Sequence, residues 1–228
     1  MDTTPPHNSN ARELVQRATE AGLQFVPVVG GALAVTFVTA VTWQLNKRRE
    51  EWLKDLAEGV EELRQRLGDV DLDSLVSDPR FVDAVVSATR TVEHTSQAEK
   101  LTALRNAVLN SVGPDAPDAD TQAMFMNLVD RFTPSHLRLL ALWDNPRAWF
   151  SSHNIREPSG SSRTATVEAG LPELAGRQQF YVLVWSELQA AGLSNGANLG
   201  GLVTSAALMD KLTSDLGSQF LKFISAPS

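Results

Sequence analysis

Along most of the chain, apolar residues recur at every third or fourth position, which is the spacing of one face of a helix. Ser9 is a candidate N-cap for a first helix, whose apolar side begins at Leu14. Pro27 and the pair Gly30 and Gly31 interrupt this pattern, because proline lacks a backbone donor and glycine favours turns. The pattern predicts a fold of mainly α class, with residues 1–8 as a disordered N-terminus.

A second, long helix is predicted to begin near Ala32 and to continue to Gly68, a length of about 36 residues. Its first part belongs to an apolar hairpin, residues 25–45, and no charged residue lies between Glu20 and Lys47. The candidates for contact with a membrane in this hairpin are Val28, Val29, Leu33, Val35, Phe37, Val38, Val41 and Trp43.

Two interpretations of the hairpin stay open. The uncharged run is long enough to cross a hydrocarbon core of about 30 Å, and the basic residues that follow, Lys47, Arg48 and Arg49, would anchor its end in the cytoplasm. Against a span, Pro27 and the two glycines leave an uninterrupted apolar helix of about 14 residues, a length typical of a buried core helix. The hairpin therefore either inserts into a membrane or forms the core of a helical bundle.

Residues 46–67 continue the long helix as an amphipathic segment. Its apolar positions have 3-4-3-4 spacing, and charged residues lie between them. These positions are Leu53, Leu56, Val60, Leu63 and Leu67. This seam favours packing within the protein's own bundle over an intermolecular coiled coil, because only two heptads are present.

An N-terminal helical region is predicted to begin at residue 9 and to end at residue 132. Capping residues mark further helix starts within it. Asp78 and Pro79 have the residue types of an N-cap and a first helical position. Ser96 and Glu99 have the spacing of a capping box for the next helix. The apolar face of that helix is predicted to consist of Leu101, Leu104, Val108 and Leu109.

Residues 133–228 have a different order: helix, polar loop, short helix, longer helix, glycine-rich region and final helix. This layout, with the segment "KLTSDLGSQFL", resembles a winged-helix domain, which implies an α+β fold with a wing hairpin. The resemblance also implies that the helix around residues 177–191 is the one that would enter a DNA groove. Its residues from Phe180 to Trp185 are typical of a core.

Composition and motifs exclude several classes of chemistry. The chain has no cysteine, so a thiolate nucleophile and a cysteine-bound metal are excluded. The histidines form no HExxH pair, and His94 and His136 are expected at the surface or at helix ends. The glycine pairs lack the context of a phosphate-binding loop. We therefore expect no enzyme, no cofactor and no metal site.

Charge argues against nucleic acid as the main partner. The formal net charge is -7, and residues 150–228 hold five basic residues against six acidic ones. DNA affinity depends on clustered basic residues. The alternative function, a cytosolic winged-helix regulator that binds DNA, would have Arg177, Gln178 and Lys211 as its contacts.

A further resemblance covers most of the chain. The segments "PVVGGAL", "NKRREEWLKDLAEGVEEL", "AEKLTALRNAVLNSV" and "FTPSHLRLLALWDNP" occur in an order similar to that of bacterial proteins in the style of the abortive-infection alpha family of phage defence. It implies a defence or stress role with no catalytic motif. We thus predict a non-enzymatic effector or adaptor of the cytoplasm, associated with the inner membrane if the hairpin inserts. Its expected partner is another protein or a second copy, with membrane lipid as the alternative.

Overall fold

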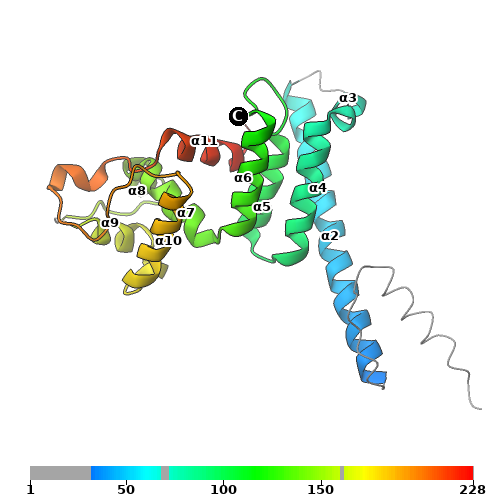
Figure 1. Cartoon of the computed structure of the whole chain (residues 1–228), viewed down its shortest axis with the longest axis horizontal. Helices are drawn as coiled ribbons and strands as arrows, with labels where there is room; N and C mark the ends of the chain where they lie inside the picture. The colour runs from blue at the N-terminus through cyan, green and yellow to red at the C-terminus, as the bar shows by residue number, and fades with distance from the viewer. Residues whose placement is uncertain (1–31, 68–71, 160–161, 228) are drawn as a thin grey trace, which may run out of the picture. The chain divides into compact units, whose positions relative to one another are not determined.

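The computed structural model describes residues 32–67, 72–159 and 162–227. These residues are mainly helical, which confirms the predicted class (Figure 1). In chain order the elements are α2 (Ala32–Leu67), α3 (Leu72–Ser77), α4 (Pro79–His94), α5 (Ala98–Leu109), α6 (Ala119–Arg131), α7 (Pro134–Asp144), α8 (Pro146–Ser152), α9 (Arg163–Gly170), the 3-10 helix η1 (Pro172–Leu174), α10 (Gln178–Ala190), the 3-10 helix η2 (Ser205–Met209) and α11 (Asp215–Ile224).

Some predictions fall outside the described residues. They are the disordered residues 1–8, the first helix from residue 9, and the interruption at Pro27, Gly30 and Gly31. The hairpin 25–45 is described only from Ala32 onward. These features stay predictions.

The chain divides into two compact units, Met1–Asp55 and Leu56–Ser228. The helix α2 contributes residues to both of them. The boundary predicted at residue 133 lies inside the second unit, where α11 contacts both α5 and α7. That boundary stays a prediction, and the structure describes Leu56–Ser228 as one compact body.

The long helix α2 begins at Ala32 and has 36 residues, as predicted. Its heptad seam is correct in part, because Leu56 and Leu63 are buried and Val60 is half-buried. The assignment of Leu53 to the seam was wrong, since that side chain is exposed. The helix turns through about 100° per residue, and Leu53 precedes Leu56 by three residues, so it lies at the edge of the buried stripe. The side chain of Leu67 lies outside the description.

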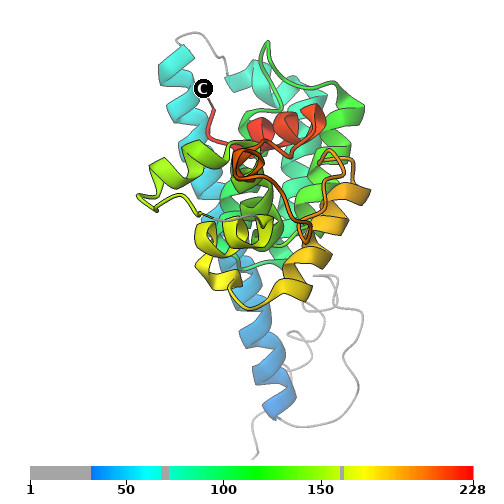
Figure 2. The same ribbon diagram turned by 90° about the vertical axis from the view of Figure 1, so that its left-hand side faces the viewer.

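In the second unit, α4, α5 and α6 pack against one another (Figures 1 and 2). The predicted start of α4 is confirmed, because the Asp78 side chain accepts a hydrogen bond from the Arg80 backbone N–H at 2.9 Å. The face of α4 toward α5 and α6 is formed by buried residues such as Phe81 and Ala88. This packing places the ends of α4 and α5 next to each other, where a polar cavity opens.

The C-terminal end of α11 is held by Asn106 of α5 and by Asn110, the residue that follows α5. The last carbonyl groups of a helix have no partner within that helix. Asn106 Nδ2 donates to the carbonyl of Ile224 at 3.0 Å, and Asn110 Nδ2 donates to those of Phe223 at 2.9 Å and Ser225 at 2.8 Å. These bonds fix α11 against α5, so helices on both sides of residue 133 belong to one packed body.

The predicted α+β winged-helix fold is not supported, because no sheet is present in the described residues. Two isolated antiparallel bridges occur instead, Ser194 with Thr213 and Ser162 with Leu202. Between Leu202 and Thr213 the chain forms the 3-10 helix η2 rather than a wing strand. Strands need β-branched or aromatic residues in alternation. Residues 194–213 contain few of these, and they are interrupted by Gly196, Gly200 and Gly201.

The core assignment within α10 was wrong at two positions. Val182 and Leu183 are exposed, whereas Tyr181, Val184 and Trp185 are buried. On a helix with one buried face, consecutive apolar residues cannot all point inward, because each residue turns by about 100°. The outer face of α10 is therefore apolar at its centre.

Candidate functional site

The described candidates for membrane contact lie on the first half of α2, within the unit Met1–Asp55. Phe37 is 68% exposed and Trp43 is 57% exposed, which are large values for aromatic side chains. Val41 is also exposed, and Val38 is half-buried. We call Phe37, Val41 and Trp43 the apolar α2 surface.

The side chains of the remaining candidates for membrane contact are not described. Val28 and Val29 lie outside the described residues. Leu33 and Val35 belong to α2, and their side chains lie outside the description. The candidate surface is therefore defined by its three exposed members alone.

The apolar α2 surface extends around the helix instead of forming one narrow stripe. Six residues separate Phe37 from Trp43, so their side chains point about 120° apart. Before Lys47, the exposed residues that point between these directions are Thr36, Ala40 and Gln44, and none of them carries a charge. This side of the helix is therefore uncharged up to Lys47, with an aromatic ring at each edge.

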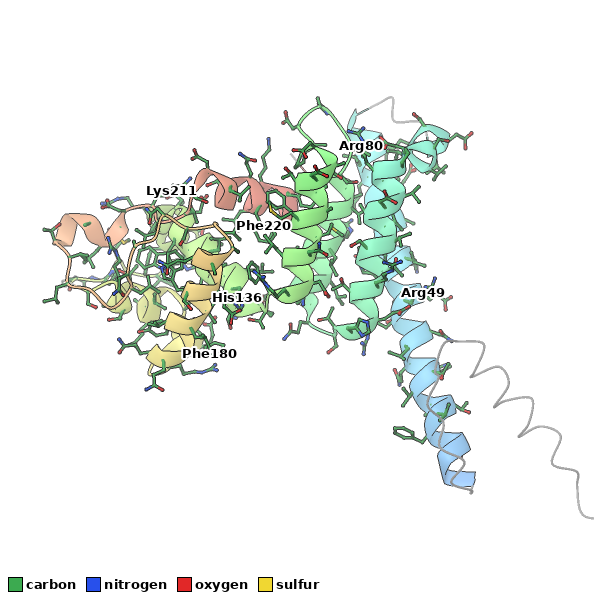
Figure 3. All side chains as sticks on the ribbon, in the orientation of Figure 1. Arg49, Arg80, His136, Phe180, Lys211 and Phe220 are labelled. Atoms are coloured by element: carbon green, nitrogen blue, oxygen red, sulfur yellow. The ribbon has the colours of Figure 1, made fainter. Side chains whose placement is uncertain are left out.

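Basic residues follow the apolar α2 surface directly. Lys47 Nζ lies 5.3 Å from the centre of the Trp43 ring, a cation–π distance, and 3.7 Å from a carboxylate oxygen of Glu51. Arg48 is half-buried and Arg49 is exposed (Figure 3). Aromatic and basic side chains therefore occur side by side on one exposed helix.

The uncharged part of α2 is short. No helix in residues 32–67, 72–159 or 162–227 is long and apolar enough to cross a membrane. In α2 the uncharged part ends before Lys47.

A second candidate site is a polar cavity of about 310 Å³ at the start of α5. It is lined by Thr91, His94, Thr95, Ser96, Gln97, Lys100 and Asp130. His94 is exposed, as predicted for a histidine at a helix end. Lys100 is only 7% exposed, and its Nζ donates to the backbone carbonyl of Asp130 at 2.7 Å. Burial lowers the pKa of Lys100, and the Asp130 carboxylate opposes this effect.

The capping box predicted for α5 was wrong. The N-cap residue is Gln97, and its side chain makes no capping bond. Thr95 Oγ1 instead accepts from the Gln97 N–H at 3.3 Å, and Glu99 pairs with Arg138 of α7. A tertiary ion pair thus takes the carboxylate that the local motif needs. Neither Lys100 nor this cavity was predicted from the sequence.

His136 is buried rather than placed at the surface. It is 5% exposed and stacks on Phe132, with ring centres 4.7 Å apart. Its Nδ1 accepts from the Thr133 backbone N–H at 3.2 Å, and its Nε2 lies 3.0 Å from Glu187 Oε2. Because Nδ1 is an acceptor, the proton is on Nε2, which donates to Glu187 of α10. The neutral imidazole thus caps α7 and ties it to α10.

This arrangement predicts a pH-dependent stability. Burial lowers the pKa of His136, against the hydrogen bond with Glu187, and nearby Arg131 and Lys100 lower it further. The unfolded chain therefore binds a proton at His136 near pH 6.5, where the folded chain does not. Stability is full above pH 6.5 and falls as the pH drops below it, by at most about 1.4 kcal/mol per pH unit.

Urea unfolding between pH 7 and pH 5 measures this effect, with the His136→Gln variant as the reference. Glutamine at this position can keep the capping bond but does not titrate. We expect a smaller loss of stability in the variant than in the wild type over this range. Equal slopes for the two proteins would contradict a buried neutral His136.

Two of the three residues proposed for nucleic-acid contact have a described partner within the chain. The Arg177 guanidinium lies 4.2 Å from the ring centre of Phe180. Lys211 Nζ lies 3.1 Å from Asp144 Oδ1 and donates to Ser218 Oγ at 2.6 Å. Gln178 is exposed at the start of α10. Lys211 is thus paired with a carboxylate, whereas Arg177 contacts an uncharged ring.

Asp144 binds the segment that follows α10 through hydrogen bonds from Thr213 and Ser218. Burial raises the pKa of Asp144, but hydrogen bonds from Ser218, Thr213 and Lys211 outweigh that effect and lower it overall. Both hydroxyl groups donate to Oδ1 at 2.6 Å. An ionised carboxylate with several donors has a structural role here, because it fixes the approach to α11.

A larger cavity of about 410 Å³ lies beside α11, and its lining is mostly apolar, with Leu63, Leu109 and Phe223 among its residues. The polar side chains at its rim already have partners: Asn110 binds the end of α11, and Lys222 pairs with Asp115 at 3.0 Å.

No group of three or more potential metal ligands occurs in the described part of the chain. Compared with known proteins, the chain matches no family model, no curated protein and no solved structure.

Proposed function

We propose that the protein is a non-enzymatic effector or adaptor that docks on an anionic membrane through the apolar α2 surface. The observation that supports this function best is the exposure of Phe37 and Trp43 on a helix that continues into Lys47, Arg48 and Arg49. Aromatic residues favour the interface between lipid and water, and basic residues favour anionic headgroups. The helix lies at the surface of the bilayer and does not cross it.

The expected strength of docking follows from these side chains. Each basic residue near an anionic surface contributes about 1 kcal/mol, and the burial of apolar area adds to this at about 25 cal/mol per Å². The cation–π pair of Lys47 and Trp43 keeps the charge and the ring on the same side of α2. Both contributions therefore act on the same leaflet.

Sedimentation with vesicles tests the proposal. Wild type is expected to bind vesicles that contain phosphatidylglycerol and to bind phosphatidylcholine vesicles more weakly. The triple variant Phe37→Ser, Val41→Ser and Trp43→Ser should bind the anionic vesicles at least tenfold more weakly, a loss of about 1.4 kcal/mol or more.

The matched control removes exposed apolar side chains elsewhere. Val182→Ser with Leu183→Ser alters the outer face of α10 and should bind vesicles like the wild type. If the triple variant also bound like the wild type, the apolar α2 surface would not be the docking element. If wild type formed dimers through this surface and did not bind vesicles, self-association would replace the membrane as its function.

The defence role is a separate part of the proposal and rests on the resemblance to abortive-infection alpha proteins. Membrane docking is a way in which such an effector could act without catalysis. In a bacterial host that expresses the chain, wild type is expected to lower plaque formation by phage, and the triple variant is expected to protect less. Equal protection by both proteins would separate defence from membrane docking.

A further inference from the structure

The polar cavity at the start of α5 contains a buried cation with unused donors. The ammonium group of Lys100 has three N–H donors, and one of them is bound by the Asp130 carbonyl. The other two have no acceptor among the described residues. A buried ammonium group that has only one hydrogen-bond acceptor is unfavourable. The cavity in front of Lys100 is therefore suited to a ligand with acceptor atoms.

Backbone donors lie next to this lysine. The first intrahelical bond of α5 runs from the Leu101 N–H to the Gln97 carbonyl at 3.1 Å. The N–H groups of Ala98, Glu99 and Lys100 precede it and have no carbonyl partner within the helix. Gln97 does not cap them with its side chain. These amides lie at the positive end of a helix of 12 residues and add to the field of the buried ammonium.

The other charged groups leave the cavity able to accept an anion. The carboxylate of Glu99 is turned to Arg138 and is neutralised there. Asp130 is exposed at the rim, where solvent and salt screen its carboxylate. Thr91, Thr95 and Ser96 also line the cavity; the Thr91 hydroxyl already donates to the Ser87 carbonyl at 3.4 Å, so the hydroxyl groups of Thr95 and Ser96 remain as donors. Hydroxyl, amide and ammonium donors together form the set that proteins use for phosphate groups.

The volume of the cavity indicates the size of the ligand. About 310 Å³ is the room of roughly ten water molecules at about 30 Å³ each. A phosphate group has five heavy atoms and fills only part of that space. The remainder can hold a small organic group.

We infer that this cavity binds the phosphate group of a small phosphomonoester, with Lys100 as its charged partner and Ser96 as a hydrogen-bond donor, at the positive end of α5. The site belongs to the unit Leu56–Ser228 and does not depend on the apolar α2 surface. A phosphate group can come from a free ester, from inorganic phosphate or from a lipid headgroup.

Calorimetric titration of the full chain at constant ionic strength tests this inference. Glycerol 3-phosphate and inorganic phosphate are the soluble probes, and vesicles with phosphatidic acid present the lipid source. The Lys100→Met variant keeps the unbranched stem and removes the ammonium group. We expect glycerol 3-phosphate to bind the wild type and to bind Lys100→Met at least tenfold more weakly.

Two further variants make the result decisive. Ser96→Ala changes an exposed side chain of the lining and should weaken glycerol 3-phosphate several-fold even if Lys100→Met fails to fold. Lys222→Met removes an exposed lysine outside the cavity and should leave the affinity unchanged. Inorganic phosphate that binds as tightly, or vesicle binding that Lys100→Met abolishes, would support the site and identify the source.

Several results would overturn the inference. They are no binding of any phosphate probe to the wild type, equal affinity of wild type and Ser96→Ala for glycerol 3-phosphate, and retention of affinity in a folded Lys100→Met variant. Vesicle binding that persists in Lys100→Met without any soluble phosphate binding would also reject the cavity as a phosphate site.

Discussion

Replacing Gly217 by alanine is expected to destabilise the unit Leu56–Ser228 by about 3 kcal/mol or more. Gly217 lies in the first turn of α11, and a Cβ atom there would overlap the carbonyl oxygen of Leu193 and lie 3.1 Å from its carbonyl carbon. That carbonyl accepts from the Ser214 N–H at 3.0 Å. Because both sides of the contact are backbone, a rotamer change cannot relieve the overlap.

Calorimetry of the full chain measures this effect. For a protein of this size, about 3 kcal/mol corresponds to a decrease in Tm of roughly 6–12 °C. The control is Gly201→Ala, because a Cβ at Gly201 meets no atom within 4 Å and its backbone is not in the left-handed region. If the two variants had the same Tm, α11 would not be packed against Leu193.

Removing the ring of Phe220 is expected to cost about 3–5 kcal/mol, the usual range for a buried phenylalanine replaced by alanine. Phe220 is fully buried in α11 (Figure 3). Its ring centre lies 5.4 Å from that of Phe125 in α6 and 6.2 Å from that of Phe132. The ring thus joins the C-terminal helix to residues before position 133, and its loss leaves a cavity at that junction.

Urea unfolding of Phe220→Ala, followed by tryptophan fluorescence, tests both the cost and the unity of this body. We expect one transition for residues on both sides of position 133, shifted as a whole to lower urea. Leu202→Ala is the control, since that side chain is 84% exposed and its removal should change stability by less than about 0.5 kcal/mol. Two transitions, with only one shifted by Phe220→Ala, would instead support separate domains.

Features of the fold that depend on local chemistry were predictable from the sequence. The start of α2 at Ala32 and the start of α4 after Asp78 follow from glycine, proline and capping residues, whose effects act within one turn. The side of a helix that is buried depends on its neighbours. For this reason the exposure of Leu53 and Leu183 was not predicted, although the helices that carry them were.

The two candidate sites also differ in whether the sequence alone reveals them. Phe37 and Trp43 were identified because an uncharged run before basic residues is visible in the sequence alone. The cavity at Lys100 was missed, because it depends on the end of α4 and on Asp130 of α6 meeting the start of α5. One signal was present: Lys100, Leu104 and Val108 are spaced by four residues, so a lysine begins the apolar face of α5.

A fluorescent probe on α2 tests the membrane proposal most directly. The chain has no cysteine, so Val41→Cys can be labelled at one position with an environment-sensitive dye. Ser186→Cys on the exposed face of α10 provides the matched control. On addition of phosphatidylglycerol vesicles, the proposal predicts a blue-shifted and several-fold brighter emission from the Val41→Cys probe, with no change from the Ser186→Cys probe. An unchanged Val41→Cys signal, or equal changes at both positions, would contradict docking through the apolar α2 surface.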